Sequence, residues 1–452
     1  MTPPRVTVVG GGLAGSEAAW TAAGLGVEVR LIEMRPAKMT AAHRTDRFAE
    51  LVCSNSFKSA RLTNASGLLK EEMRRLGSLV VAEAEAAAVP AGEALAVDPE
   101  AFAEAITRRI ASCPQIVVER REASAVPADR PVIIATGPLT SEAMAAALGE
   151  LTGQASLHFY DAVAPTVTLE SIDMTRAFRA SRRNRGPTDE SVGSDDYINC
   201  PMTREEYDRF YQALIHAEAA DPHLASEKDA RYFEACVPVE VLAARGPRTL
   251  AFGPMRPVGL VDPRTGRRPH AVVQLRQENR LGTLWGLVGF QTRLKWGEQR
   301  RVFRLIPGLE SAEFVRYGVM HRNTYVNSPL VLLPDLQMRA HDGIFLAGQL
   351  TGVEGYIESA AMGLLAGLNA ARRALGLGTV TPPKETVIGS LCRYITEADP
   401  RSFAPMNANH GLLPPIEPRP RDRTQRGPAF AARSLEALER WLTMTRPSTR
   451  TE

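Results

Sequence analysis

The sequence predicts an α/β fold that is assembled from both ends of the chain, with an α+β domain inserted between them. Two strand–loop–helix units, one beginning at Arg5 and one at Gly343, are the first observation. The second is the stretch from about 166 to 305, where strand-like runs alternate with turns rich in proline and glycine. We predict boundaries at 1–165, 166–305 and 306–452, which suits a chain of 452 residues because domains average roughly 150 residues.

The N-terminal unit has the pattern of a dinucleotide-binding fold. The strand Arg5–Val9 leads into a glycine-rich turn, then a helix over Ser16–Ala23 and a strand over Val27–Ile32 that ends at an acid. The glycines permit a tight turn, close approach of a pyrophosphate and close packing of helix on strand. The helix N-terminus offers N–H groups to phosphates, and the acid accepts ribose hydroxyls. The alternative is a glycine-rich turn without a ligand. The candidate cofactor-binding residues are Gly10, Gly11, Gly12, Leu13, Ala14, Gly15 and Glu33.

Two later segments extend this prediction to FAD. Pro131–Ala135 is strand-like and runs into an Ala-Thr-Gly sequence, which resembles the strand ends of FAD proteins of the glutathione-reductase type. Gly343–Ala347 is a second such strand, followed by the loop Gly348–Gly352 and a helix of small residues over Gly355–Leu375. We therefore predict a glutathione-reductase-type Rossmann domain. Tyr356, at the start of this helix, either stacks on a ring system or simply caps the helix. The added cofactor candidates are Thr136, Gly137, Gly348, Gln349, Gly355 and Tyr356.

The remaining elements are read from caps, apolar runs and turns. Asp98 before Pro99 predicts the start of a helix that runs to Ala111, because this pair combines an N-cap with a first-turn proline. Within the insertion, Val272–Leu275 and Leu284–Phe290 are strand-like. The tail is charged and ends in a helix near Arg433–Leu442.

Composition and charge exclude several classes of protein. Apolar residues are 44 % and charged residues 23 %, as in soluble globular proteins, and no run approaches the ~18 apolar residues of a membrane span. We expect a cytoplasmic protein that does not contact a membrane. The excess of basic residues, 54 − 51 = 3, neither implies nor excludes nucleic-acid binding. The five cysteines lack the spacing of a zinc site or a disulfide scaffold, so we expect no metal.

Two cysteines lie in segments that suit chemistry. Cys53 is surrounded by small polar residues, and Cys236 precedes a Val-Pro break. Each is a candidate catalytic thiol, and the alternative is a buried structural cysteine. Cys200 is a weaker candidate, whereas Cys113 and Cys392 have the context of packing residues.

Three basic runs, Arg176–Arg185, Gln291–Arg304 and Arg419–Arg426, mark possible contacts to a polyanion. A run of charges is usually a solvated face. Two of the runs nevertheless fall in the inserted domain, and one of them contains Trp296 and directly follows Phe290, which favours RNA binding through phosphate contacts and stacking. The candidate RNA-binding residues are Arg182, Arg183, Arg293, Lys295, Arg300 and Arg301.

Taken together, these segments resemble the folate- and FAD-dependent tRNA (uracil-5-)-methyltransferases of the TrmFO type. The matching strings include Val8–Trp20, Glu50–Phe57, Ala135–Ser141, Cys200–Thr203, Phe233–Val239, Phe252–Gly259, Val272–Arg276, Gly289–Thr292, Lys295–Gln299, Arg316–Ser328, Ala347–Gly363 and Pro405–Pro414. The resemblance implies methylation of C5 of the T-loop uridine, position 54 of tRNA, with 5,10-methylenetetrahydrofolate as carbon donor and FAD as reductant, itself reduced by NADH or NADPH. It implies tRNA, through its T-arm, and folate as partners, and no obligate protein partner.

The resemblance also assigns the two functional cysteines of the family to Cys53 and Cys236. A thiolate that adds to uracil C6 makes C5 nucleophilic, and a second group must remove the C5 proton. We favour Cys236 as nucleophile and Cys53 as proton-transfer or methylene-handling group, although the reverse stays open. The target base must leave its stack. Three alternatives are an NAD(P)H-dependent flavin oxidoreductase, a GidA-like enzyme that modifies another tRNA uridine, and a flavin-bound RNA chaperone without catalytic activity.

Overall fold

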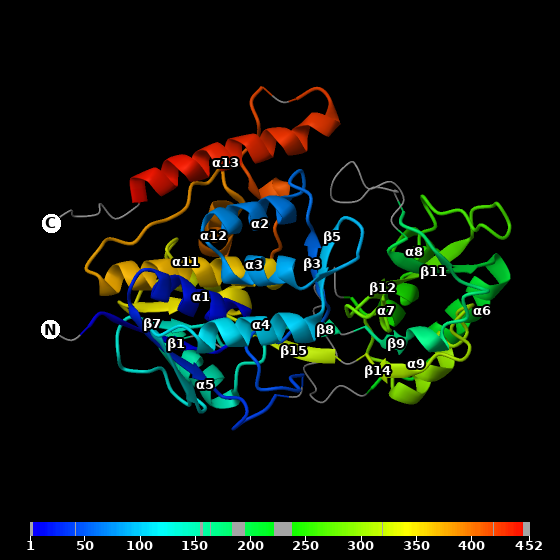
Figure 1. The fold of residues 1–452 in the computed structure, drawn as a ribbon, viewed down its shortest axis with the longest axis horizontal. Helices are drawn as coiled ribbons and strands as arrows, with labels where there is room; N and C mark the ends of the chain where they lie inside the picture. Colours follow the sequence, from blue (N-terminus) through cyan, green and yellow to red (C-terminus); the bar gives the residue numbers. More distant parts are fainter. Residues whose placement is uncertain are drawn as a thin grey trace.

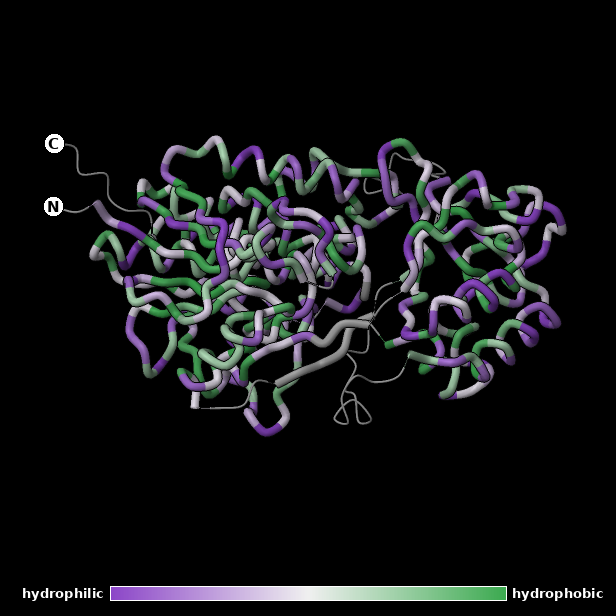
Figure 2. Tube along the Cα trace, turned by 90° about the horizontal axis from the view of Figure 1, so that it is seen from below, coloured by the Kyte–Doolittle hydropathy of each residue, from purple (hydrophilic) through white to green (hydrophobic). Residues whose placement is uncertain are grey.

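The computed structural model describes residues 3–40, 42–153, 157–162, 164–182, 195–220, 237–318, 320–418 and 420–445, with the backbone alone for 157–162, 320–322 and 423. The chain forms two bodies (Figure 1). The larger contains both described ends of the chain, residues 3 and 445, and most of the described helices, and the smaller is built from the middle of the chain. A tube view from below shows hydrophobic stretches running through both bodies (Figure 2).

A parallel sheet of five strands lies at the centre of the larger body. Its order is β16-β7-β1-β2-β6, and every neighbouring pair is parallel. The strand from the C-terminal part of the chain, β16, pairs with β7, so the predicted assembly from both chain ends is confirmed. The strands are β1 Arg5–Val9, β2 Glu28–Glu33, β6 Ile116–Arg120, β7 Val132–Ile134 and β16 Ile344–Leu346.

Alternation along these strands separates two apolar layers. Val6, Val8 and Leu31 point to a core shared with the helices α1, α3, α4 and α11. Val9 and Ile32, the next residues in the pleat, point to the opposite face, which α5 covers. Successive side chains of a strand face opposite sides, so both faces of the sheet are buried, as a parallel sheet requires. The helices are α1 Leu13–Gly24, α3 Leu79–Ala86, α4 Pro99–Ala111, α5 Glu142–Thr152 and α11 Tyr356–Ala374.

Further elements surround this sheet. Asp98 caps α4 as predicted, since its side chain accepts the backbone N–H groups of Glu100 and Ala101. The last helix is longer than predicted, because it begins at Arg426 rather than Arg433. The remaining elements of the larger body are β3 Ser56–Ser59, α2 Ala65–Arg75, β4 Ala88–Val89, β5 Ala94–Val97, α10 Ser328–Val331, α12 Val387–Glu397 and α13 Arg426–Thr445.

The smaller body is an antiparallel sheet with its own core. The order is β10-β11-β12-β13-β9-β14, and its core includes Trp285, Phe290 and Phe303, all fully buried. The sheet extends to Arg316, past residue 305, and the domain boundaries stay a proposal. The strands β8 Leu157–Ala162 and β15 Met320–Tyr325 pair with each other between the two bodies. The other elements are β9 Thr166–Thr168, β10 Phe178–Arg179, β11 Tyr197–Met202, β12 Ala271–Gln277, β13 Leu284–Leu287, β14 Phe314–Arg316, α6 Arg204–Ile215, α7 Val239–Ala244, α8 Thr249–Phe252 and α9 Trp296–Phe303.

Glycines let α11 lie directly against α1, the helix that follows the glycine-rich turn. A Cβ on Gly363 would lie 2.1 Å from the carbonyl oxygen of Ala14, and a Cβ on Gly367 would lie 2.5 Å from that of Ala18. The helix of small residues predicted from the sequence therefore brings the C-terminal part of the chain to the nucleotide-binding turn.

We expect Gly363→Ala to lower the free energy of unfolding by about 1–3 kcal/mol, the range for overpacking a tight contact. Gly297→Ala is the control, because a Cβ there meets no atom within 4 Å. Chemical denaturation of both variants measures the difference. Equal stability of the two would contradict the close packing of α11 on α1.

Candidate active site

In the glycine-rich turn between β1 and α1, Gly10, Gly12 and Gly15 are required for different structural reasons. Gly10 has φ +102°, and a Cβ there would lie 2.5 Å from the carbonyl oxygen of Ala135. A Cβ on Gly15 would lie 1.7 Å from the carbonyl oxygen of Gly10, so this position brings helix and strand together. A Cβ on Gly12 meets no atom within 4 Å. The turn thus leaves open space at the N-terminus of α1, where a phosphate group fits.

Glu33, at the end of β2, is buried against this turn. Its Oε2 accepts the backbone N–H of Gly11 at 2.6 Å, and its Oε1 accepts the backbone N–H and the Nε of Arg35, each at 2.9 Å. Burial raises the pKa of Glu33, but the hydrogen bonds and charge of Arg35 and the Gly11 N–H outweigh it, so the pKa lies below its usual value. Glu33 is therefore an anion that braces the turn. Its contact with a ribose stays a prediction.

Two cavities meet at Gly12 and together form an elongated site. The first, of about 70 Å³, is lined by Gly10, Gly11, Gly12, Glu33 and Thr136 among others. The second, of about 290 Å³, continues past Leu13 and Ala14 to Gly137, Gln349, Gly355, Tyr356 and Cys53. An extended dinucleotide fits this arrangement, with its phosphates at the open space beside Gly12. Among the predicted cofactor residues, Gly15 and Gly348 act in packing, because a Cβ on Gly348 would lie 2.7 Å from Ala14 Cβ.

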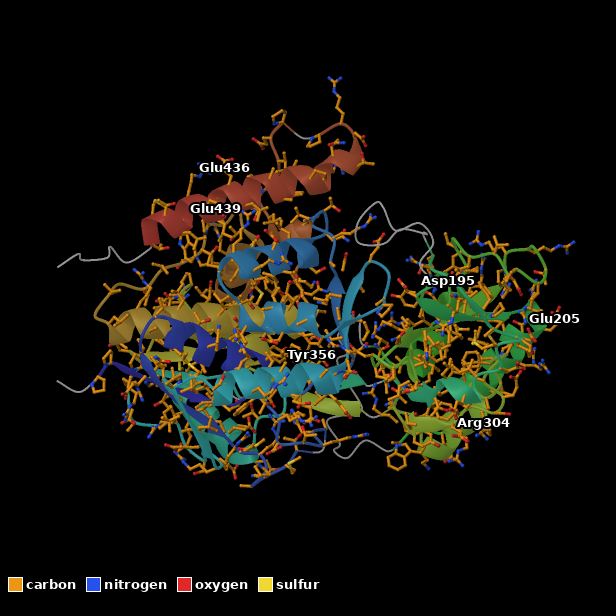
Figure 3. All side chains as sticks on the ribbon, in the orientation of Figure 1. Asp195, Glu205, Arg304, Tyr356, Glu436 and Glu439 are labelled. Carbon is orange, nitrogen blue, oxygen red and sulfur yellow. The ribbon has the colours of Figure 1, made fainter. Side chains whose placement is uncertain are left out.

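Tyr356, labelled in Figure 3, connects α11 to the loop that carries Cys53. Its phenol oxygen accepts the backbone N–H groups of Cys53 at 2.8 Å and Ser54 at 3.0 Å. Its ring packs on Phe57, with 5.7 Å between the ring centroids. Tyr356 is the first residue of α11, and its hydroxyl fixes the position of the half-buried Cys53 at the cavity wall.

Tyr356→Phe should lower the turnover number of the enzyme roughly 10- to 100-fold. The Cys53 loop would lose its anchor, and a small displacement of a reacting group lowers the rate by about this factor. The variant leaves two backbone N–H groups without their acceptor but keeps the ring. FAD content should stay near that of the wild type. Tyr394→Phe is the control, since that hydroxyl donates to the carbonyl of Ala404 and does not line either cavity. Equal turnover of the two variants would mean that the Tyr356 hydroxyl does not position the thiol.

Sequence reasoning did not identify an ion pair at the same end of α11. Lys58 lines the larger cavity, and its Nζ lies 2.7 Å from Oε1 of Glu358, which is fully buried. Lys58 has φ +64°, a conformation that is rare for a residue with a side chain. Local sequence carries no signal for this pair, because the two residues come from distant parts of the chain.

A further cavity, of about 120 Å³, also borders the Cys53 loop. Cys53, Ser54 and Gln291 line it, together with charged residues of the smaller body. Arg276 Nε donates to Oδ1 of Asn55 at 2.9 Å, which ties the loop to β12. Arg316 forms an ion pair with Glu278 at 3.1 Å. Arg276, Gln291 and Arg316 belong to strings that carried the family resemblance, but nothing local marks them as site residues.

The structure places the predicted thiols unequally. Cys53 lines both the cavity of about 290 Å³ and the cavity of about 120 Å³. Cys236 lies outside the described residues. Cys200 and Cys392 are fully buried, and burial raises the pKa of both thiols. The burial of Cys392 agrees with its predicted packing role, and Cys200, the weaker catalytic candidate, is a packing residue as well. In the described part of the chain, no group of His, Cys, Asp and Glu could hold a metal ion.

The predicted tRNA-binding residues do not form one cluster. Arg182 is half-buried, donates to the carbonyl of Pro254 and lies near α8, whereas Arg183 lies outside the described residues. The others lie on or before α9, at the opposite end of the smaller body in Figure 1. Arg301 pairs with Glu298 at 2.7 Å, Lys295 with Glu218 at 2.7 Å, and Arg293 Nε lies 3.9 Å from Glu240. Arg300 differs, because it donates to the neutral hydroxyl of Tyr317 at 2.9 Å.

The parallel sheet, the open glycine turn and the thiol-bearing cavity define a Rossmann-fold flavoprotein. Comparisons narrow this class. The family model "Glucose inhibited division protein A" matches residues 5–378. A methylenetetrahydrofolate–tRNA-(uracil-5-)-methyltransferase TrmFO from Symbiobacterium thermophilum is 59 % identical over 98 % of this chain and 98 % of its own. The TrmFO of Thermus thermophilus is 57 % identical over 98 % and 97 %. The chain therefore belongs to the glucose inhibited division protein A family, in its TrmFO-type branch.

A solved structure supports the fold assignment. Aquifex aeolicus GidA aligns with a TM-score of 0.66 at 16 % identity, covering 97 % of this chain and 76 % of its own. In the part of this chain that the structure describes, no helix is long and apolar enough to cross a membrane.

Proposed function

We propose that the protein methylates C5 of the T-loop uridine, position 54, of tRNA, with 5,10-methylenetetrahydrofolate as carbon donor. The observation that carries the proposal is Cys53, which lies where a dinucleotide-shaped cavity meets a polar cavity of the smaller body. A thiol with a cofactor on one side and space for a base on the other suits covalent chemistry on uracil. The relatives named as tRNA (uracil-5-)-methyltransferases support the substrate.

FAD, when bound, supplies the electrons that reduce the transferred one-carbon unit, and NADH or NADPH restores them. The residues of this chain do the rest. Gly10–Ala14 and Glu33 would hold the ADP half, while Gly137, Gln349 and Gly355 line the space for the ring. One thiolate adds to uracil C6, and a second group removes the proton from C5 once the new bond has formed. The electron pair left at C5 then expels the thiolate from C6, which breaks the sulfur–carbon bond and regenerates the nucleophile. We assign the first step to Cys236 and the second to Cys53.

A contact near Cys236 in the sequence supports this pairing. Val239, three residues after Cys236, donates its backbone N–H to the carbonyl oxygen of Gln291 at 2.7 Å. Gln291 lines both cavities that Cys53 lines. We propose that the enzyme acts in the cytoplasm, binds the T-arm of tRNA and folate, and needs no obligate protein partner.

The test is incubation of the protein with unmodified tRNA, methylenetetrahydrofolate and NADH or NADPH, followed by nucleoside analysis. We expect 5-methyluridine in wild-type tRNA and none in a tRNA with cytidine at position 54. A modified uridine at the anticodon instead would indicate GidA-like specificity. Oxidation of NAD(P)H without a modified nucleoside would indicate a simple flavin oxidoreductase. Either result would overturn the proposal.

Charge reversal on α9 should weaken tRNA binding and its dependence on salt. For Arg300→Glu combined with Arg301→Glu, we expect the slope of log affinity against log salt to fall by about one, because each lost phosphate contact removes roughly one unit. Most of this should come from Arg300, since Arg301 already pairs with Glu298. The control is Arg401→Glu, an exposed arginine of the larger body. An unchanged slope would show that the basic residues of α9 form a solvated face that does not contact tRNA phosphates.

A further inference from the structure

Three aromatic rings form a column on the surface of the smaller body. Trp296, the first residue of α9, stacks on Tyr317 with 5.6 Å between centroids and 14° between planes. Tyr317 in turn stacks on Phe314, at 5.4 Å and 17°. We call Trp296, Tyr317 and Phe314 the aromatic column. Its inner end contacts the core through Phe303, and Trp296 is its outer end.

Packing within the smaller body does not account for the exposure of Trp296. This side chain is 63 % exposed, whereas Val302 and Phe303 on the same helix and Phe290 just before it are fully buried. The two aromatics at the basic run therefore separate into a core residue, Phe290, and a surface residue, Trp296. Exposed Leu281 and Val315 lie on the same body. Both line one cavity with Tyr317 of the aromatic column, and exposed apolar groups that gather in this way mark interaction sites.

The column carries positive charge at its side. Arg300 donates from Nε at 3.1 Å and from Nη2 at 2.9 Å to the Tyr317 hydroxyl. This contact holds the guanidinium beside the stacked rings through a neutral partner, so its charge is available to an anion. The acid of the same helix, Glu298, pairs instead with Arg301. A flat ring beside a fixed guanidinium is the combination that binds a base and its phosphate in single-stranded nucleic acid.

One ring of the column, Tyr317, lines a cavity that shares two residues with the small cavity beside Cys53. Tyr317 and Val315 line a cavity of about 490 Å³ together with Arg316 and Glu278. Arg316 and Glu278 also line the small cavity beside Cys53. The two cavities thus meet at the Arg316–Glu278 pair. The space beside Cys53 and the aromatic column are thus linked through this pair and through Tyr317, on which Trp296 stacks.

We infer that Trp296 is a stacking platform for an unpaired base of the tRNA, close in sequence to the target uridine, with Arg300 on the adjoining phosphate. This inference rests on the proposed function and assigns part of its substrate contact. A base that leaves its helix loses stacking on its neighbours. An exposed ring restores that stacking for a flanking base, whatever its identity, because every base has a π face.

The test compares Trp296→Ala, Trp296→Phe and Phe252→Ala as full-length proteins loaded with FAD. Phe252 is the matched control, since it is 70 % exposed and lies on α8 at the other end of the smaller body. Binding of an unmodified tRNA transcript is measured over a salt series. We expect Trp296→Ala to weaken binding about 10-fold, within the range for one base–aromatic stack, with an unchanged salt slope. Trp296→Phe should bind within about 3-fold of the wild type, because a ring remains.

Two further readouts separate the explanations. Tryptophan fluorescence of the wild type should be quenched by tRNA, and this quenching should decrease in Trp296→Phe, which retains Trp20, Trp285 and Trp441. Wild-type affinity in Trp296→Ala, or an effect of equal size in Phe252→Ala, would overturn the inference. So would a change of oligomeric state, which would mean that a second copy of the chain covers Trp296. The proposed function is tested by a separate result, because it is wrong if the wild type makes no 5-methyluridine.

Discussion

Methylation should fall by at least ~1000-fold in Cys53→Ala and in Cys236→Ala, as it does when a group central to covalent catalysis is removed. Each substitution removes one small thiol. Cys53 is only half-buried and sits on a loop that Tyr356 and Arg276 hold through other atoms. We therefore expect a normal fold and near-normal FAD content in both variants. Nucleoside analysis and the visible absorbance of the flavin measure the two properties.

Cys113→Ala is the matched control for these variants. Its thiol is also half-buried, but it lies beside Gln115 and lines none of the cavities described above. A tRNA that contains 5-fluorouridine separates the two roles, because the fluorine at C5 prevents proton removal after the thiolate has added. A trapped covalent complex should form with Cys53→Ala but not with Cys236→Ala. The opposite result would exchange the two roles, and full activity of either variant would end the two-thiol mechanism.

Gly12→Leu should yield a folded but colourless protein. A Cβ at this position meets no protein atom within 4 Å, and the backbone there has φ −73°, so the fold tolerates a side chain. The same open space is where the phosphates of FAD approach the N-terminus of α1, and a leucine would fill it. Flavin absorbance should be lost, and thermal unfolding of the variant should match that of the wild type after its FAD has been removed.

The control is Gly24→Leu, at the other end of the same helix, where a Cβ also meets no atom within 4 Å. This variant should stay yellow. The contrast with Gly15 is equally informative, because a Cβ at Gly15 would lie 1.7 Å from a carbonyl oxygen and any substitution there should disturb the fold itself. If Gly12→Leu retained FAD, the phosphates would have to bind elsewhere in the chain.

The sequence alone was sufficient to predict the strand–turn–helix unit at Arg5–Glu33 and the return of the chain at Gly343. These are local patterns: a strand, a glycine turn and a helix each depend on residues that are close together in the chain. The cap at Asp98 was predicted for the same reason. The predicted packing role of Gly15 agrees with the structure, because in every such turn the absence of a Cβ lets the helix pack closely against the strand.

Tertiary structure decided which side chains far apart in the sequence meet and which stay exposed. The hydroxyl of Tyr356 meets the backbone of Cys53 across 303 positions, so no local pattern distinguishes that role from stacking or capping. The charges of a basic run look alike in the sequence, but Arg301 is paired with an acid whereas Arg300 lies against a neutral phenol. Phe290 and Trp296 likewise lie only six positions apart, and only the fold buries the first and exposes the second. Burial and charge pairing are properties of the packed chain, because they depend on which distant surfaces meet.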